Sequence, residues 1–352
     1  MQTCPHVRPG TATKDTEIRC MRPEDACGVP ALMREVYGET YPKKLVYDPV
    51  LLRKKTANGE IFPVIAAGPT GNVIGYAALS AYYGYPEIGL LGTLAVSPAC
   101  RGRGLGGKLH RHLISCGMSA GFVALSGGAF TSHPFSQKIL EQGGFCPTAI
   151  LLGSQPQSIS FHGIAETLGQ RESVAFYTRL LAPQKYGIQY LPASHHQVIT
   201  EICRDIGLTA ISERPGHSPV GIPSVCEELL NADNGAGLIW MRIAGDDCRE
   251  VLGTATRRLR SAGAKVLRLH LNLNDPGSPS AVQVAEKAGF VFAGILPGKD
   301  GIILLMQNLL DIALDPEKLC LTGNPAGSRL LAYIGMQVKN NRGGTHKVPQ
   351  AL

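Results

Sequence analysis

Apolar positions in the first half of the chain alternate between strand-like and helix-like spacing. Two β-rich apolar runs cover residues 61–67 and 73–81, and the Gly- and Pro-containing cluster between them predicts a hairpin. Another apolar run at residues 88–96 predicts a long strand. From Leu105 to Cys116 the apolar residues recur at helical spacing, so a helix follows this strand.

The same reading predicts the other elements of residues 15–182. A proline and two acidic residues open the first helix, where the helix dipole favours negative charge. We expect strands at residues 17–20, 122–125, 145–152 and 173–181, and helices at residues 23–37, 48–56 and 134–142.

A glycine-rich loop joins the strand at 88–96 to the helix that begins at Leu105. It reads Val96-Ser97-Pro98-Ala99-Cys100-Arg101-Gly102-Arg103-Gly104-Leu105-Gly106-Gly107. Glycines allow backbone N–H groups to approach a pyrophosphate closely, and the helix N-terminus adds unsatisfied donors. With two arginines as counter-charge, the loop predicts a site for an anionic cofactor.

Two signatures fit these glycines. Gly102, Gly104 and Gly107 also satisfy the dinucleotide pattern G-x-G-x-x-G, which requires an acidic residue about 20 positions further on. No Asp or Glu occurs between Arg101 and Glu141. The sequence therefore disfavours a dinucleotide.

The order of strand, V-x-P-x-x-R-G-x-G-x-G and helix resembles the coenzyme A loop of the GNAT superfamily of N-acetyltransferases, over residues 15–182. The resemblance implies an α/β (α+β) fold with a mixed, mostly antiparallel sheet flanked by helices, and acetyl-CoA as co-substrate. In that family one strand splays from its neighbour, and the thioester lies in the gap. The residues implied in cofactor binding are Leu94, Ala95, Val96, Arg101, Gly102, Arg103, Gly104, Leu105, Gly106, Gly107 and His133.

The chain departs from this family where protons are transferred. Members of the family often have a glutamate on the strand at 88–96, where this chain has Gly92, and a tyrosine that acts as the acid, where it has Leu140. Where they usually have an asparagine that contacts the cofactor arm, this chain has His133. As substitutes we consider Glu87 for the base and His133, whose ordinary pKa is near neutrality, for the acid. Glu87 faces the other side of the strand by simple alternation unless a bulge intervenes.

The second half looks like a degenerate copy of the first. A shift of 145 residues places Pro134, Glu141 and Phe145 on Pro279, Glu286 and Phe290. The same shift places the glycine loop on residues 246–251, which contain acids and no glycine. We therefore expect two tandem GNAT-like domains, of which one binds coenzyme A. The predicted organisation is a flexible N-terminus at 1–14, the acetyltransferase domain at 15–184, the degenerate domain at 185–310, and a C-terminal segment with a basic tail at 311–352.

Composition is compatible with two such domains. The chain has 352 residues, 44% hydrophobic residues, a net charge of +7 and ten cysteines without a C-x-x-C pair. These features predict reduced thiols, a cytoplasmic location and no bound metal. No apolar run reaches the roughly 18 residues of a membrane span. The sequence also lacks a stripe of basic residues interleaved with aromatic residues, so we do not expect nucleic acid binding. A small basic cluster in the tail contains Lys339, Arg342, His346 and Lys347.

Two functions remain open. The chain is an N-acetyltransferase that transfers acetyl to a primary amine of a small molecule or peptide, or it is an acyl-CoA-binding regulatory protein with little catalysis. The absent glutamate and tyrosine favour the second function, and the intact loop suits both. The sequence leaves a homodimer open and does not identify the acceptor.

Overall fold

The computed structural model describes residues 16–209, 211–217 and 220–343 of the chain. The first half contains β1 (Glu17–Cys20), α1 (Val29–Tyr37), α2 (Pro49–Ala57), β2 (Ile61–Ala67), β3 (Val73–Tyr82), β4 (Tyr85–Val96), α3 (Leu105–Ser119), β5 (Ala124–Phe130), α4 (Phe135–Gln142), β6 (Cys146–Gln155) and β7 (Glu172–Leu180). The second half contains β8 (Ile188–Gln189), α5 (His196–Asp205), β9 (Ser212–Glu213), β10 (Val225–Asn231), β11 (Ala236–Ile243), α6 (Cys248–Ser261), β12 (Val266–Asn272), α7 (Ser278–Lys287), β13 (Val291–Pro297), β14 (Ile302–Asn308) and α8 (Pro325–Gly343).

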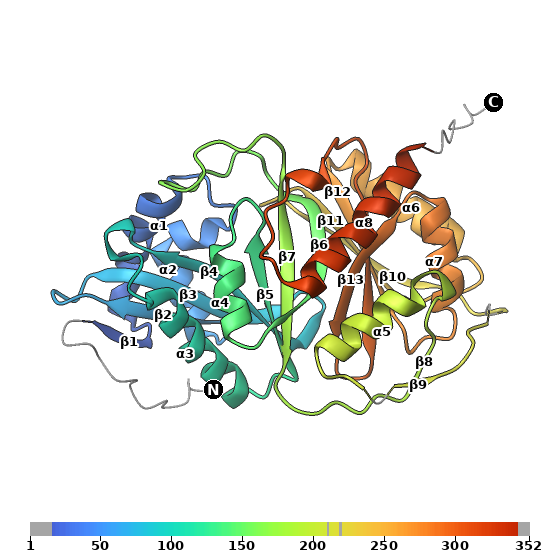
Figure 1. Ribbon diagram of the computed structural model, residues 1–352, viewed down its shortest axis with the longest axis horizontal. Helices are drawn as coiled ribbons and strands as arrows, with labels where there is room; N and C mark the ends of the chain where they lie inside the picture. The colour runs from blue at the N-terminus through green and yellow to red at the C-terminus, as the bar shows by residue number, and fades with distance from the viewer. Residues whose placement is uncertain (1–15, 210, 218–219, 344–352) are drawn as a thin grey trace.

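In the described part of the chain, twelve strands form one mixed, mostly antiparallel sheet. Its order is β1-β2-β3-β4-β5-β7-β6-β13-β14-β12-β11-β10. The two halves lie side by side, and β6 and β13 meet at the seam between them (Figure 1). A single register pair, Gly294 with Ala149, joins these two strands.

The two halves repeat one pattern of strand pairing. In the first half β4 is parallel to β5, and β7 pairs antiparallel with both β5 and β6. In the second half β11 is parallel to β12, and β14 pairs antiparallel with both β12 and β13. A helix crosses over between the strands of each parallel pair, as parallel pairing requires. The strand order of the second half therefore mirrors that of the first across the seam.

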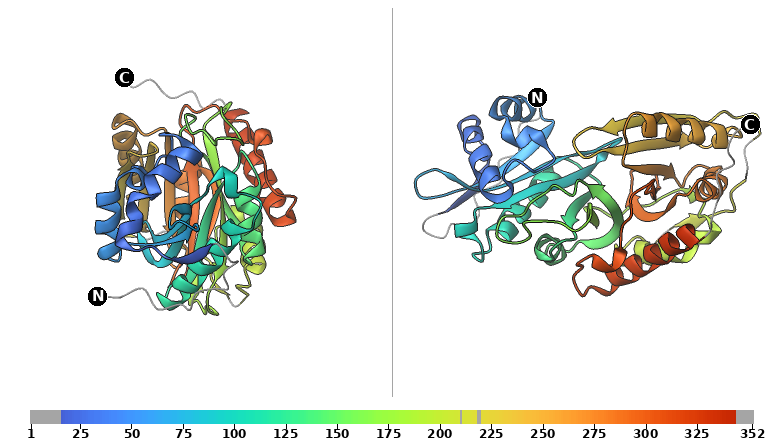
Figure 2. Two further views of the ribbon diagram at one scale, coloured as in Figure 1. Left: turned by 90° about the vertical axis from the view of Figure 1, so that its left-hand side faces the viewer. Right: turned by 90° about the horizontal axis from the view of Figure 1, so that it is seen from above.

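One apolar cluster continues through both halves. On α3 the face that carries Leu105, Leu109 and Leu113 is buried, and Phe290 and Phe292 belong to the same cluster in the second half. The C-terminal helix α8 packs on both β6 and β13 and so covers the seam (Figures 1 and 2). The seam is thus part of the hydrophobic core rather than a linker.

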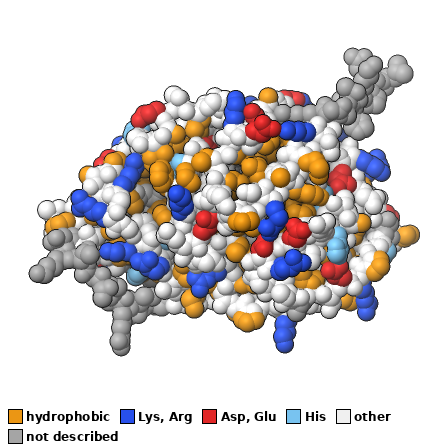
Figure 3. Space-filling model, in the orientation of Figure 1, with side chains coloured by type: hydrophobic (Ala, Val, Ile, Leu, Met, Phe, Trp, Pro, Cys, Tyr) orange, Lys and Arg blue, Asp and Glu red, His pale blue; other side chains and the backbone are white. Residues whose placement is uncertain are grey.

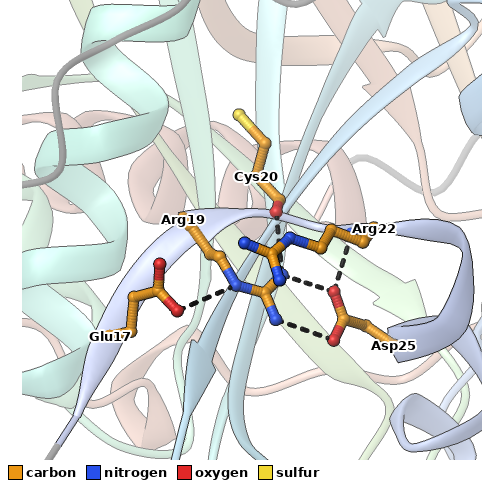
Figure 4. Close-up of polar contacts among 5 residues, drawn as sticks. All are labelled: Glu17, Arg19, Cys20, Arg22 and Asp25. Atoms are coloured by element: carbon orange, nitrogen blue, oxygen red, sulfur yellow. Dashed lines mark hydrogen bonds and ion pairs between the residues drawn. The ribbon is translucent and has the colours of Figure 1, made fainter. Parts of the chain in front are cut away.

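An ion pair fixes β1 to the turn that follows it. Arg19 on β1 donates two hydrogen bonds to the carboxylate of Asp25, at 2.5 and 2.9 Å, and the Arg22 amide donates a third at 2.6 Å (Figure 4). Burial of Asp25 opposes its charge, but these hydrogen bonds outweigh burial and lower its pKa. The first strand is therefore anchored by charge as well as by its pairing with β2.

Most of the predicted elements agree with the structure to within a few residues, and two differ. The strand predicted at 122–125 lies at Ala124–Phe130 instead, because the chain turns at Gly121 (φ +78°) and Val123 donates to the carbonyl of Glu87. The predicted tail contains α8, so Lys339 lies on a helix, where its ammonium donates to Glu317 at 2.8 Å. The flexible N-terminus predicted at 1–14, together with His346 and Lys347, lies outside the described residues.

None of the described helices combines the length and apolar character that crossing a bilayer requires. On the face drawn in Figure 3, basic and acidic side chains are interspersed.

Candidate active site

The glycine loop has the backbone conformation that its sequence requires. After β4 a short turn at Pro98–Cys100 leads through Arg101 to α3. Gly102 (φ +76°) and Gly104 (φ +71°) are both left-handed, a conformation that L side chains rarely adopt. A Cβ atom at either position would meet no described atom within 4 Å. The loop is therefore open, and its glycines leave room for a ligand.

The amino end of α3 offers hydrogen-bond donors beside this loop. The first helical hydrogen bond runs from the Lys108 amide to the Gly104 carbonyl at 3.1 Å. The amides of Leu105, Gly106 and Gly107 precede it and have no acceptor within the helix. Arg101 donates to the carbonyl of His162 at 3.1 Å, and Arg103 is exposed. This donor set suits a pyrophosphate.

Strand β4 separates from β5 next to the loop. The two strands pair from Ile88 with Ala124 to Leu91 with Gly127, and no described pairing follows. At the point of separation Thr93 has φ +55°, and the register of β4 against β3 shifts there. This bulge and the loss of pairing open a gap along Gly92 to Val96, as the family resemblance implies.

The gap continues into a cavity of about 180 Å³ between the two halves. The first half lines it with Gly92, Thr93 and Leu94 of β4, Gly127 and Gly128 of β5, and Ile139 and Leu140 of α4. The second half contributes Asn231, Asn234, Leu238, Arg268 and His270. A Cβ at Gly127 would overlap the side chain of Leu140, so this glycine lets α4 lie close to β5. The cavity thus needs both halves.

Two cationic side chains line this cavity. The ammonium of Lys43 lies above Gly92, where a Cβ would be 3.3 Å from Nζ. Burial lowers the pKa of Lys43, against the charge of Asp233. The buried Nε of Arg268 has no hydrogen-bond partner among the described residues. Both cations therefore face the cavity without a neighbouring carboxylate in its lining.

Two tyrosine hydroxyl groups form hydrogen bonds with β4 at its bulge. Tyr41 donates to Oγ1 of Thr93 at 3.2 Å, and Tyr37 donates to the carbonyl of Leu94 at 3.1 Å. Burial raises the pKa of Tyr41 to about 12, so its phenol stays protonated at neutral pH. Tyr41 is a potential proton donor that lines the cavity.

The two predicted catalytic residues lie elsewhere. Oε1 of Glu87 accepts a hydrogen bond from the Lys299 amide at 3.2 Å, and Glu87 does not line the cavity. His133 packs with its ring 5.4 Å from Phe135 and 5.1 Å from Phe161. Burial, with the charge of Arg101, lowers the pKa of His133 to about 4, so it is neutral at pH 7. The geometry does not favour Glu87 as base or an imidazolium at His133 as acid, although the buried Nδ1 of His133 has no partner among the described residues.

Sequence reasoning located the loop and the gap but missed Tyr41, Lys43 and Arg268. Tyr41 and Lys43 stand in a connecting segment with no recognisable spacing, and Arg268 lies on β12, where it alternates with leucines and precedes His270. A single arginine within a buried strand is a signal that could have been used, because arginine is rarely buried without a partner.

Comparison with known proteins finds a family match for part of the chain. Residues 29–145 match the family model described as the acetyltransferase (GNAT) family. No curated protein matches the chain.

Solved structures similar to this chain include an N-acetyltransferase from Staphylococcus aureus Mu50, with 19% identity over 47% of this chain and 99% of that chain and a TM-score of 0.36. Another is a GNAT superfamily phosphinothricin acetyltransferase from Sinorhizobium meliloti in complex with AcCoA, with 23% identity over 47% of this chain and 89% of that chain and a TM-score of 0.38. Each match covers slightly less than half of this chain.

Proposed function

We propose that the protein transfers an acetyl group from acetyl-CoA to the primary amine of a small molecule or peptide, because residues 29–145 match the model of the GNAT acetyltransferase family. One observation carries this proposal: the gap beside β4 runs from the open glycine loop to a cavity between the two halves. A donor can enter from the loop side while an acceptor occupies the cavity.

The residues at the gap suit coenzyme A. The amides of Gly102 to Gly107, with Arg101 and Arg103, would hold the pyrophosphate, and the backbone of Leu94, Ala95 and Val96, which has no described pairing with β5, would hold the pantetheine arm. His133 lies near Arg101 and would contact the cofactor through Nδ1. Acetyl-CoA supplies an activated acyl carbon, and the chain positions an amine against it.

Charge in the cavity favours deprotonation of the amine, the step for which the family's glutamate usually serves as base. The reaction forms an N–C bond and breaks a C–S bond, while the amine loses a proton and the thiolate gains one. Lys43 and Arg268 disfavour a further positive charge nearby, so they lower the pKa of an amine bound between them. Water takes the proton, and Tyr41 donates one to the thiolate.

The role of the glycine loop is tested by Gly104→Val. Gly104 and Gly121 have similar φ values of +71° and +78°, and neither has a neighbouring atom where a Cβ would lie. Gly121→Val therefore imposes the same backbone strain away from the loop. We expect acetyl-CoA binding, measured by calorimetry, to be lost in Gly104→Val and retained in Gly121→Val. Equal binding by both variants would refute the cofactor assignment.

A turnover assay distinguishes an enzyme from the alternative, an acyl-CoA-binding regulatory protein. That alternative is favoured because Gly92 and Leu140 stand where the family's proton-transfer residues usually are. Acetyl-CoA and a pool of amines are incubated with the protein, and release of free thiol is followed. We expect turnover that falls at least about tenfold in Tyr41→Phe, with a smaller effect of Glu87→Gln and His133→Gln. Tight acetyl-CoA binding without turnover on any amine would establish the regulatory alternative.

We also propose that residues 185–310 are a degenerate copy of the domain at 15–184, followed by a C-terminal segment at 311–352. The support is the mirrored strand pairing across the seam. At the place of the glycine loop, Asp246 and Asp247 accept hydrogen bonds from the amides of Gly221 and Ser224 at 2.9 and 2.7 Å. The chain's own backbone fills this position, so the second copy holds no coenzyme A there. A cytoplasmic location and a homodimer stay predictions.

A further inference from the structure

The cavity between the halves has an unbalanced charge. Lys43 and Arg268 line it, and none of its described lining residues is an aspartate or a glutamate. His110 and His270 also line it, but burial lowers their pKa values to about 4 and about 3, so both are neutral at pH 7. The side chains of Lys43 and Arg268 thus face the space that an acceptor would occupy, without an acidic residue in its lining.

Arg268 has no acidic partner within the described chain. It makes no ion pair there, its Nε is buried without a hydrogen bond, and the charge of Arg171 acts on it repulsively. Arg171 itself donates to the carbonyls of Gly153 and Asn234 at 2.7 and 2.8 Å. A half-buried guanidinium whose Nε lacks a partner is costly, and a carboxylate satisfies it with two parallel hydrogen bonds.

We propose that the acceptor is an amine that carries an anionic group, of the amino-acid type, and that Arg268 and Lys43 bind this anion. The inference rests on the proposed function for the identity of the reacting group. It gives the second half a role, because β12 supplies Arg268 to a site whose donor loop belongs to the first half. Polyamines and other multiply charged cations are poor acceptors in this field.

The test compares amino acids with their uncharged amides, and adds a phosphonate and a polyamine. The full chain with saturating acetyl-CoA is assayed with glycine and glycinamide, methionine and methioninamide, aminomethylphosphonate, and spermidine. We expect the amino acids to exceed their amides by about 10- to 100-fold in kcat/KM. The phosphonate distinguishes a general anion site from one that selects carboxylates.

Arg268→Met should remove this preference by raising KM for the amino acids with little change for the amides. Arg258→Met is the matched control, because Arg258 is exposed on α6 and pairs with Glu228 at 3.5 Å. Arg268→Lys restores part of the preference if the charge is what matters, and thermal melts confirm that each variant is folded.

Two results overturn the inference: equal or better acetylation of amides or spermidine, or an unchanged preference in Arg268→Met. Calorimetric titration of methionine in the presence of coenzyme A measures the anion site without turnover. Binding that is lost in Arg268→Met supports the inference even if no amine is acetylated, in which case the proposed function alone fails. Absence of binding together with turnover on amides refutes only the inference.

A second group of residues, outside the cavity lining, carries an independent inference. Cys20 on β1 and His112 and Cys116 on α3 place their ligand atoms within 4.8 Å of one another, and Sγ of Cys20 lies 3.7 Å from Nε2 of His112. Figure 4 shows the Cys20 side chain pointing away from the ion pair of Arg19 and Asp25. His112 and Cys116 are four residues apart, so they share one face of the helix.

We infer that these three side chains form a zinc site. Zinc bound to sulfur at about 2.3 Å and to nitrogen at about 2.0 Å in a tetrahedron places two such ligands roughly 3.6 Å apart. Binding would release the protons of the two thiols and leave a fourth position for water. The site ties the first strand to the helix that carries the glycine loop.

Metal analysis tests this site. Protein stripped with a chelator is incubated with Zn²⁺, dialysed and analysed for metal, and a parallel sample is titrated with Co²⁺. We expect about one metal ion per chain and thiolate-to-cobalt absorption. Both should be lost in His112→Gln and Cys116→Ser, while Cys27→Ser, which alters an exposed cysteine outside the group, retains them. No retained zinc and no thiolate absorption in the folded parent would refute the site.

Discussion

The junction of the two halves depends on one glycine. Gly294 on β13 has φ +141° and pairs with Ala149 on β6. A Cβ at this position would lie closer than 3.0 Å to the carbonyl oxygen of Thr148 and to the Cα and Cβ atoms of Ala149, and real Cβ atoms essentially never make such close contacts. Two of these atoms are backbone, so a rotamer change does not relieve the overlap.

The cost of Gly294→Ala follows from two effects. The backbone conformation is strained for alanine by about 1–3 kcal/mol, and overpacking of the junction adds about 1–3 kcal/mol. We therefore expect a loss of about 2–6 kcal/mol in the free energy of unfolding. For a unit of 150–250 residues each kcal/mol lowers Tm by about 2–4 °C, so Tm should fall by at least about 4 °C.

The assay is thermal and guanidinium unfolding, followed by circular dichroism and by the fluorescence of Trp240. This residue is the single tryptophan of the chain and lies on β11, so its signal reports on the second half. Gly169→Ala is the control, because Gly169 has no positive φ and no atom within 4 Å of a Cβ. If both variants unfold within about 0.5 kcal/mol of the parent, the reasoning about the junction is wrong.

Three further predictions concern stability. Asp25→Asn should cost about 1–3 kcal/mol at pH 7, because it leaves Arg19 with the exposed Glu17 as its charge partner and removes the carboxylate that accepts two of its hydrogen bonds; since the pKa of Asp25 is lowered from 3.8, the difference from the parent should be full above that value, shrink as pH falls below it and vanish below the lowered pKa, which urea unfolding at several pH values checks. Burial lowers the pKa values of His110, His133 and His270 to about 4, 4 and 3, so the unfolded chain takes up protons first and stability should decline as pH falls from about 6.5; His270→Phe should flatten this decline, and an unchanged slope would contradict the assignment. Gln137→Leu should lower Tm by several degrees, because the Gln137 amide bonds both Tyr177 and the backbone of Cys320 and Thr322; scanning calorimetry measures it, and Gln184→Leu, an exposed site, should have no effect.

The glycine loop could be predicted because its chemistry is local. Positive φ at Gly102 and Gly104 follows from the need for a tight turn with room for a ligand, and the flanking apolar spacing placed the strand and helix. Strand β5 was displaced in the prediction because Gly127 and Gly128 look like a loop in sequence. In the fold they are strand residues, since the side chain of Leu140 takes the space of a Cβ at Gly127.

Helix α8 shows a signal that was present but not used. Leu330, Ile334 and Val338 recur every four residues and are all buried, so helical spacing was readable despite the basic residues around them. The lining of the cavity, in contrast, could not be predicted from local sequence patterns. Arg268 and Lys43 are far apart in sequence, and their approach depends on how the halves pack, which local patterns do not encode.

The mirrored sheet places in one chain a contact that two subunits would otherwise have to make. β6 and β13 belong to one chain, so the cavity that needs both halves assembles in every molecule, whatever the protein concentration. Dilution therefore does not separate the two halves of the cavity, which stay together at any protein concentration.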